Sequence, residues 1–164
     1  LLRAYARLLE THPDLELLCV GKPQPGGATE KLLHKLGIAD KVQFVSGIST
    51  EDMVRYYAEA TMAITPSVYE GFGLPAGEAM ACGVPVVSSD GGALPEVVGD
   101  AGVLFPAKDV DAMVDAIDAQ LSDPARRDEL GERAKARIEE QFCWHVCARQ
   151  MTDYYHQVLD SENG

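Results

Sequence analysis

The sequence predicts an α/β fold in which a doubly wound parallel sheet is covered by helices on both faces. Short, almost entirely apolar segments alternate with longer amphipathic segments from residue 1 to about residue 105. Strands that are buried on both faces are continuous apolar runs, whereas helices on such a sheet bury only one side. From residue 109 onward the pattern is helical throughout. These observations together predict a Rossmann-like domain that ends in C-terminal helices.

The first part of the chain alternates helix and strand. The periodicity predicts helices over residues 1–11, 28–38 and 49–60, and strands over residues 15–20, 41–47 and 61–65. Gly37 suits the left-handed cap at the end of the second helix, and Ser49 followed by acidic residues is a capping signature for the third.

The second part repeats the alternation and then becomes helical. A short helix over residues 74–83 has Pro75 in its first turn and Gly83 at its end, and strands follow over residues 84–89 and 102–105. The connection between these two strands is expected to be a loop. The helical region from residue 109 to residue 159 is interrupted at residues 122–125 and again near residue 141.

The composition excludes several partners. Fourteen basic and 26 acidic residues give a formal net charge of −12, which argues against nucleic acid and against an anionic membrane surface. No apolar run is long enough to cross a bilayer, and the first residues lack the layout of a signal peptide. The four cysteines lack the spacing of a disulfide framework, so a cytoplasmic location is expected.

No metal or other cofactor is expected. Cys143 and Cys147 flank His145, but a zinc site would need a fourth ligand. The Asp-Val-Asp run at residues 109–111 matches a manganese motif, although Asp109 is better explained as the N-cap of a helix.

The segment around residues 70–78 carries the predicted chemistry. Ligands of open parallel sheets bind beyond the carboxyl ends of the strands, where this segment lies. Gly71 and Gly73 let the backbone approach a ligand, and Pro75 begins a helix whose N–H groups and dipole favour a phosphate. Glu70 precedes this turn and Glu78 is placed in the first turn of the helix, where each carboxylate could accept hydroxyl groups. A diphosphate between two hydroxyl-rich rings, as in a nucleotide sugar, fits this layout.

These residues carry a family resemblance. The segment EGFGLPAGEAMACGVPVVSSDGGALPEVVGDAGVLFPAKD, residues 70–109, resembles the nucleotide-sugar half of the retaining glycosyltransferases of family 4, the "group 1" family with the two-domain GT-B fold. The spacing of Glu70 and Glu78 is similar to the signature motif of that family. Residues 42–73 and 142–159 are similar to the segments that precede and follow it.

The resemblance implies a role for each matching residue. Glu70 would be the catalytic residue that contacts hydroxyls of the donor sugar, and Glu78 would hold the ribose. The base would lie near Gly47 and Ile48. The backbone that meets the sugar and the distal phosphate would belong to Gly71, Phe72, Gly73 and Leu74. A side chain at Gly73 is therefore expected to obstruct phosphate more than it disturbs the fold.

The resemblance also implies a reaction and a larger protein. A hexosyl group would pass with retention of configuration from a nucleoside-diphosphate sugar, with UDP favoured by family frequency, and without an essential metal. The acceptor, a sugar, lipid or small molecule, would bind a separate amino-terminal half that would also provide any membrane association. Residues 1–164 are thus interpreted as a donor-binding domain that lacks its first strand and the acceptor domain. Alone it should be inactive, with Lys22 as its nearest candidate cation.

Two alternatives belong to other classes of protein. A nicotinamide-binding Rossmann domain would use the Gly-Phe-Gly turn and Asp90 as the ribose acceptor, although the third glycine of that motif is one place late. A noncatalytic module that binds a nucleotide or a partner protein would need only the acidic surface and the long terminal helices.

Overall fold

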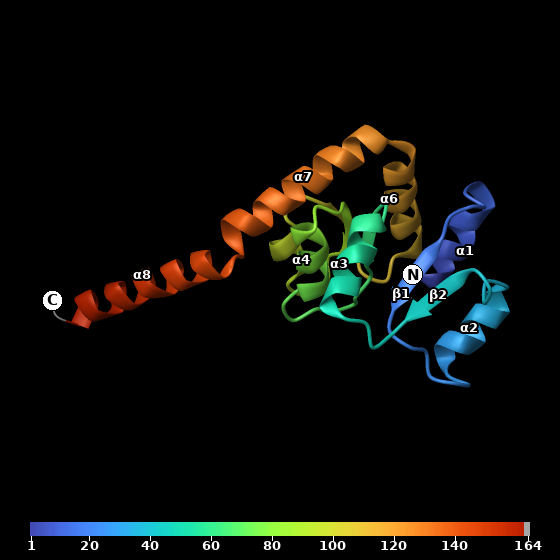
Figure 1. Ribbon diagram of the computed structural model, residues 1–164, viewed down its shortest axis with the longest axis horizontal. Coiled ribbons are helices and arrows are strands. Elements are labelled where there is room, and N and C mark those ends of the chain that lie inside the picture. The colour runs from blue at the N-terminus through green and yellow to red at the C-terminus, as the bar shows by residue number, and fades with distance from the viewer. Residues whose placement is uncertain (163–164) are drawn as a thin grey trace.

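The computed structural model describes residues 1–162 and confirms the α/β fold class (Figure 1). The elements in chain order are α1 (Leu2–Thr11), β1 (Leu17–Val20), α2 (Ala28–Leu36), β2 (Val42–Val45), α3 (Thr50–Glu59), β3 (Ala63–Thr65), α4 (Leu74–Ala81), β4 (Val86–Ser89), α5 (Leu94–Val98), β5 (Val103–Phe105), α6 (Val110–Ser122), α7 (Pro124–Gln141) and α8 (Trp144–Glu162).

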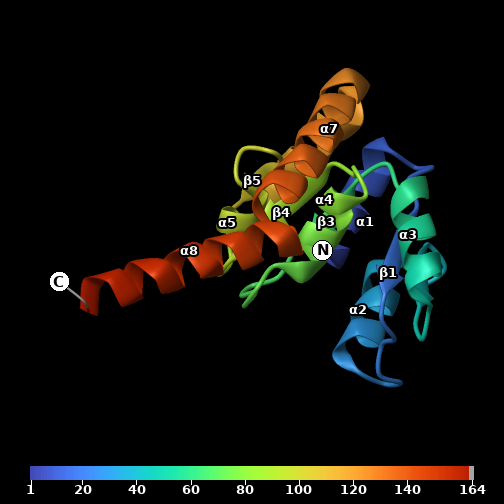
Figure 2. The ribbon, with the colours of Figure 1, turned by 60° about the vertical axis from the view of Figure 1, so that its left-hand side comes forward.

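The strands are parallel but form two separate sheets. β1 pairs with β2, and β4 lies between β3 and β5. Within residues 1–162 no hydrogen-bonded ladder joins β1 to β3, so each sheet ends in an open edge. Figure 2 shows β1 lying apart from β3 and β4. The apolar strand β1 is correspondingly incompletely covered, and Val20 is 54% exposed.

The three-stranded sheet has a core on each face. β4 is buried along its whole length, and its successive side chains point to opposite faces. Val86 packs into a core formed with α4, α5 and α7, whereas Val87 packs into a second core with α1, β5 and α6. This arrangement of helix, sheet and helix is the doubly wound packing that the apolar strands predict.

Helix α1 contributes to the cores of both sheets. Ala4 and Leu8 lie in the core shared with β4, β5 and α6, while Tyr5 packs with α2 and the β1–β2 sheet. The Tyr5 hydroxyl lies between two carbonyl oxygens, 2.8 Å from that of Leu15 and 2.9 Å from that of Lys41.

We expect the substitution Tyr5→Phe to lower the free energy of unfolding by about 1–3 kcal/mol, because it removes the hydroxyl group that bonds two partly buried carbonyl groups. Chemical denaturation measures this loss. Tyr154→Phe, at an exposed position on α8, is the control and should change the free energy by less than about 0.5 kcal/mol. Equal effects of the two substitutions would contradict the role given to the Tyr5 hydroxyl.

The structure differs from the prediction in one connection, and its strands are shorter than the predicted ones. Residues 94–98, expected within a loop, form the helix α5, whose Leu94, Val97 and Val98 are buried. Five residues are too few to show helical periodicity, so only packing reveals this helix. The predicted caps are confirmed: the Ser49 side chain accepts the Asp52 N–H, and Gly37 is left-handed with a φ of 68°.

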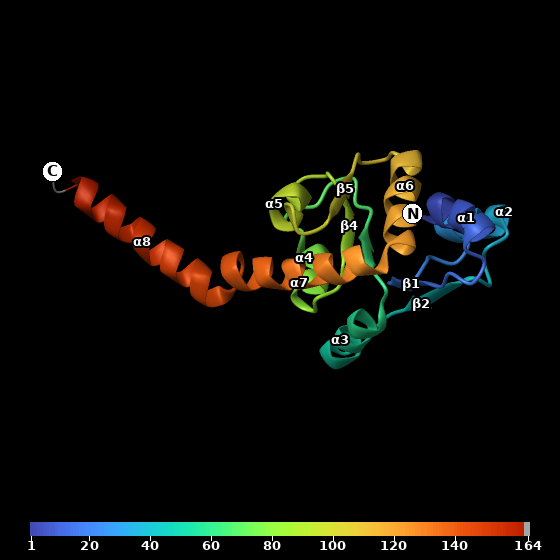
Figure 3. The same ribbon diagram turned by 90° about the horizontal axis from the view of Figure 1, so that it is seen from above.

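Helix α8 projects away from the body of the molecule (Figure 3). Its exposed side chains include large apolar ones, among them Trp144, Met151 and Tyr154. Among the residues that the structure describes, no helix combines the length and apolar character that crossing a bilayer requires.

Candidate functional site

The predicted anion-binding turn lies at the carboxyl end of β3, between that strand and α4. Gly73 is the N-cap of α4 and has a left-handed conformation, with a φ of 70°. Within the described residues no side chain caps this helix, and Pro75 occupies its first turn. Backbone N–H groups at the start of α4 therefore remain available to an acceptor such as a phosphate oxygen.

Glu70 is half-buried at the start of this turn and is held by two hydrogen bonds. Its carboxylate oxygen Oε2 accepts the Ser67 hydroxyl at 3.3 Å, and its backbone carbonyl accepts the Ala93 N–H at 2.9 Å. The loop after β4 thus fixes the backbone from which the Glu70 side chain extends. The carboxylate keeps acceptor capacity for a ligand hydroxyl.

The side chains around this turn are exposed to an unusual degree. Tyr69 and Phe72 are 77% and 79% exposed, and Leu74 at the start of α4 is also exposed. Large apolar groups on a surface often mark a place where a ligand or another domain binds. The turn accordingly presents the backbone of Gly71 and the apolar side chains to the outside, whereas Gly73 is buried.

Glu78 lies in the second turn of α4, and the prediction that placed it in the first turn was wrong. Gly73 fixes the start of the helix, which makes Glu78 its fifth residue and places it on the same face as Leu74. Burial and then the Glu78 carboxylate raise the pKa of the Tyr57 hydroxyl and of the Cys82 thiol above their ordinary values. Glu78 therefore faces two groups that are uncharged at neutral pH. The Tyr57 hydroxyl donates to the Pro75 carbonyl at 3.4 Å, which links α3 to α4.

Gly47 and Ile48 lie in the loop after β2, a strand of the other sheet. Gly47 is left-handed with a φ of 66°, and Ser49 caps α3 immediately afterwards. Within residues 1–162 no hydrogen bond joins Gly47 or Ile48 to the turn at residues 70–74. The structure thus places Glu70 and the turn before α4 and Glu78 on that helix, while the predicted base-binding residues lie in the loop after β2.

The two glycines of the turn have different surroundings. Apart from Gly71 itself and its two neighbours in the chain, no described residue has a heavy atom within 4 Å of a Cβ built on Gly71, but one built on Gly73 would lie 3.0 Å from Val97 Cγ2. A β-branched side chain at Gly73 would also have to adopt a left-handed backbone. This geometry does not support the expectation that a side chain at Gly73 would obstruct phosphate more than it disturbs the fold, and Gly71 is the better probe.

We expect Gly71→Val in the full-length protein to leave the thermal midpoint close to that of the wild type while abolishing the stabilisation produced by UDP. Gly73→Val should also lower the midpoint without ligand, because left-handed strain and crowding each cost about 1–3 kcal/mol. Thermal melts with and without UDP test both. If UDP raised the thermal midpoint of Gly71→Val as much as that of the wild type, the backbone at Gly71 would not approach the anion.

Four residues that support the turn were not assigned from the sequence. Ser67 and Ser89 donate hydrogen bonds to Glu70 and to the Ser67 carbonyl, and Gly91 and Gly92 pack against residues 67–70. The paired glycines, one residue after the end of an apolar strand, are a visible signal in the sequence. Their role depends on a contact between two loops, which spacing along the chain does not reveal.

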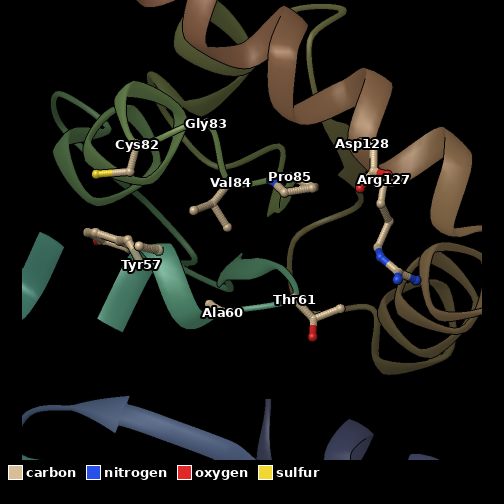
Figure 4. A pocket seen from close by; sticks show the side chains of 10 residues that line it. Tyr57, Ala60, Thr61, Cys82, Gly83, Val84, Pro85, Arg127 and Asp128 are labelled. Atoms are coloured by element: carbon tan, nitrogen blue, oxygen red, sulfur yellow. The ribbon is translucent and has the colours of Figure 1, made fainter. Parts of the chain in front are cut away.

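The hollow shown in Figure 4 is at the opposite ends of the strands. It has a volume of about 290 Å³ and is lined by the segments that lead into β3 and β4 and by Arg127 and Asp128 of α7. The Arg127 guanidinium donates to the Gln120 and Leu121 carbonyls and so caps the end of α6. This hollow is therefore distinct from the turn that carries Glu70.

The remaining sequence motifs have structural partners. The Asp109 carboxylate accepts the Ala112 N–H at 2.9 Å, which confirms its role as the N-cap of α6. The Asp90 carboxylate accepts the Ala107 N–H at 2.7 Å and so fastens the loop after β5. The described residues contain no group of three or more side chains placed to hold a metal ion.

Comparison with known proteins identifies the class. A family model described as "Glycosyl transferases group 1" matches residues 1–137. An MMP alpha-(1->4)-mannosyltransferase of Mycolicibacterium hassiacum is 44% identical over 97% of this chain and 39% of its own length. A D-inositol 3-phosphate glycosyltransferase of Kribbella flavida is 34% identical over 98% of this chain and 40% of its own.

A solved structure agrees with this classification. The sucrose-phosphate synthase of Thermosynechococcus elongatus superposes with a TM-score of 0.81 at 34% identity, over 98% of this chain and 42% of that one. The fold is the C-terminal, Rossmann-like half of a GT-B protein. The chain belongs to the group 1 family of glycosyl transferases, as its sequence predicts. It spans about two fifths of the length of the curated relatives it matches.

Proposed function

We propose that this chain is the donor-binding domain of a retaining glycosyltransferase that transfers a hexosyl group from a nucleoside-diphosphate sugar to an acceptor hydroxyl. The observation that carries the proposal is the turn between β3 and α4, in which a half-buried carboxylate stands beside exposed backbone and an uncapped helix start. A relative with 44% identity that is named a mannosyltransferase supports a hexosyl donor.

Each part of the turn has a role in this proposal. The backbone of Gly71, Phe72, Gly73 and Leu74 binds the sugar and the distal phosphate, and the start of α4 offsets the phosphate charge. Glu70 accepts a hydroxyl of the donor sugar. Glu78 accepts the ribose hydroxyls from the second turn of the helix, where its side chain is exposed.

The proposed reaction requires no metal. The bond between the sugar and the diphosphate breaks, the acceptor oxygen forms a new bond on the same face of the sugar, and the acceptor proton passes to the departing phosphate oxygen. Glu70 would orient the sugar for this exchange and exclude other poses. The acceptor would bind an amino-terminal half of the full-length protein.

The open sheet edges support the interpretation that the domain is completed by a further strand. One parallel strand between β1 and β3 would join the two sheets into one. The added strand would then have β1 and β2 on one side and β3, β4 and β5 on the other, which is the strand order of a doubly wound sheet. Such a strand would cover the exposed side of β1. It would also end beside the turn at residues 70–74 and bring its following loop to the donor.

The proposal is tested with the full-length protein. Isothermal titration with UDP, GDP, ADP and NAD should show binding of a nucleoside diphosphate in preference to the dinucleotide, and a panel of nucleotide sugars should then identify the donor. Preference for NAD would favour a nicotinamide-binding domain. Binding of a nucleotide without turnover of any donor would favour a noncatalytic module.

A further inference from the structure

The loop after β4, residues 90–93, lies directly against the loop that carries Glu70. A Cβ built on Gly91 would stand 2.5 Å from the Val68 carbonyl oxygen and 2.8 Å from that of Ser67. One built on Gly92 would stand 2.9 Å from the Glu70 nitrogen and closer still to the Glu70 carbonyl oxygen. The atoms that block these positions are backbone atoms, which cannot rotate away as a side chain can.

Hydrogen bonds hold the same two loops together. The Ala93 N–H donates to the Glu70 carbonyl at 2.9 Å, and the buried Ser89 hydroxyl donates to the Ser67 carbonyl. The Ser67 hydroxyl in turn donates to the Glu70 carboxylate at 3.3 Å. A continuous series of contacts therefore runs from the end of β4, a fully buried strand, to the carboxylate.

We propose that Gly91 and Gly92 are positioning residues for Glu70. Because they have no side chains, the loop after β4 packs against the backbone of residues 67–70 and sets where the Glu70 carboxylate stands. The proposal rests on the proposed function in so far as it predicts an effect on sugar transfer. The contact between the two loops can be tested independently of that function.

The chain offers a matched set of glycines for the test. The φ of Gly91 is not left-handed, but its surroundings leave no room for a Cβ. Gly37, in contrast, has a left-handed φ of 68° and open space around it. Gly92 combines a left-handed φ of 66° with the lack of room. Gly91→Ala thus isolates the clash, Gly37→Ala isolates backbone strain, and Gly92→Ala combines the two.

The first measurement is amide hydrogen exchange in the full-length protein. Gly91→Ala and Gly92→Ala should accelerate exchange of the Ala93 amide, whose N–H bonds the Glu70 carbonyl, by tenfold or more, and Gly37→Ala should leave this amide unchanged. Unchanged exchange in both Gly91→Ala and Gly92→Ala would overturn the proposal, whether or not the protein transfers sugar.

The second measurement is a double-mutant cycle on transfer. Gly91→Ala should lower kcat/KM at least tenfold in the wild-type background and less than threefold in the Glu70→Gln background, because a residue that acts through Glu70 has little left to disturb once Glu70 is altered. A general loss of folded protein would give the same factor in both backgrounds and would overturn the positioning role.

A milder variant keeps the test decisive if Gly91→Ala fails to fold. Ser89→Ala removes the hydrogen bond to the Ser67 carbonyl without adding bulk, and the same cycle with Glu70→Gln then applies. Absence of transfer by the wild-type protein would reject the proposed function, and the exchange measurement would still decide whether the two loops hold each other.

Discussion

Replacing Glu70 with glutamine should reduce sugar transfer by the full-length protein about tenfold to a hundredfold, while its fold and its affinity for a nucleoside diphosphate stay close to those of the wild type. The expected loss corresponds to a charge-assisted hydrogen bond to a sugar hydroxyl, roughly 1.5–3 kcal/mol. The backbone of the loop should remain in place, because the Ala93 N–H bonds the Glu70 carbonyl and not its side chain.

Steady-state kinetics, UDP titration and a thermal melt together test this expectation. Glu139→Gln, which removes the same charge at an exposed position on α7, is the matched control and should leave kcat/KM within twofold. Activity of Glu70→Gln within twofold of the wild type would contradict the assignment of Glu70 as a catalytic residue. A large loss of thermal stability would instead indicate a structural role.

The second large effect concerns residues 1–164 in isolation, which should transfer no sugar and bind a nucleoside diphosphate only weakly. The net charge of −12 opposes the approach of an anion, and the start of α4 contributes only roughly 0.3–2 kcal/mol. Lys22, the nearest candidate cation by sequence, is exposed beyond β1 on the separate sheet. A single flexible ammonium group neutralises a bound diphosphate less well than two cations held in fixed positions would.

Without an acceptor-binding half, nothing orients the attacking hydroxyl, so even a bound donor would lack proximity catalysis. Titration of UDP and GDP into the isolated chain, together with a donor-consumption assay, measures both quantities against the full-length protein. Sub-micromolar affinity or turnover by the isolated chain would show that these residues already contain the whole site.

The sequence predicted those parts of the molecule that depend on local pattern. The helix caps at Ser49 and Asp109 and the breaks between the last three helices follow from residue type and spacing. The apolar run at residues 84–89 predicted a central strand, and β4 is buried throughout. The place of the turn before α4 also follows, because a strand, two glycines and a proline occur in that order.

Features that depend on contacts between distant segments could not be predicted in this way. Gly91 and Gly92 were visible as turn residues, but the carbonyl groups they touch belong to a loop about twenty residues earlier. The separation of the two sheets is likewise invisible in the sequence, because β1 and β3 have the same apolar character whether or not a neighbour pairs with them. Helix α5 is set by the burial of three side chains and not by periodicity.

The position of α1 has a consequence for how the chain unfolds. In the part of the chain that the structure describes, no ladder of hydrogen bonds joins the two sheets, so on hydrogen bonding alone each could unfold separately. Ala4 and Tyr5 are adjacent in sequence but belong to different cores, and loss of either core exposes one side of the same helix. The free energy of unfolding of each sheet, with the helices packed on it, therefore includes contacts that are lost when the other sheet unfolds. Such coupling favours a single cooperative transition, with a denaturant dependence that reflects the surface of both sheets together.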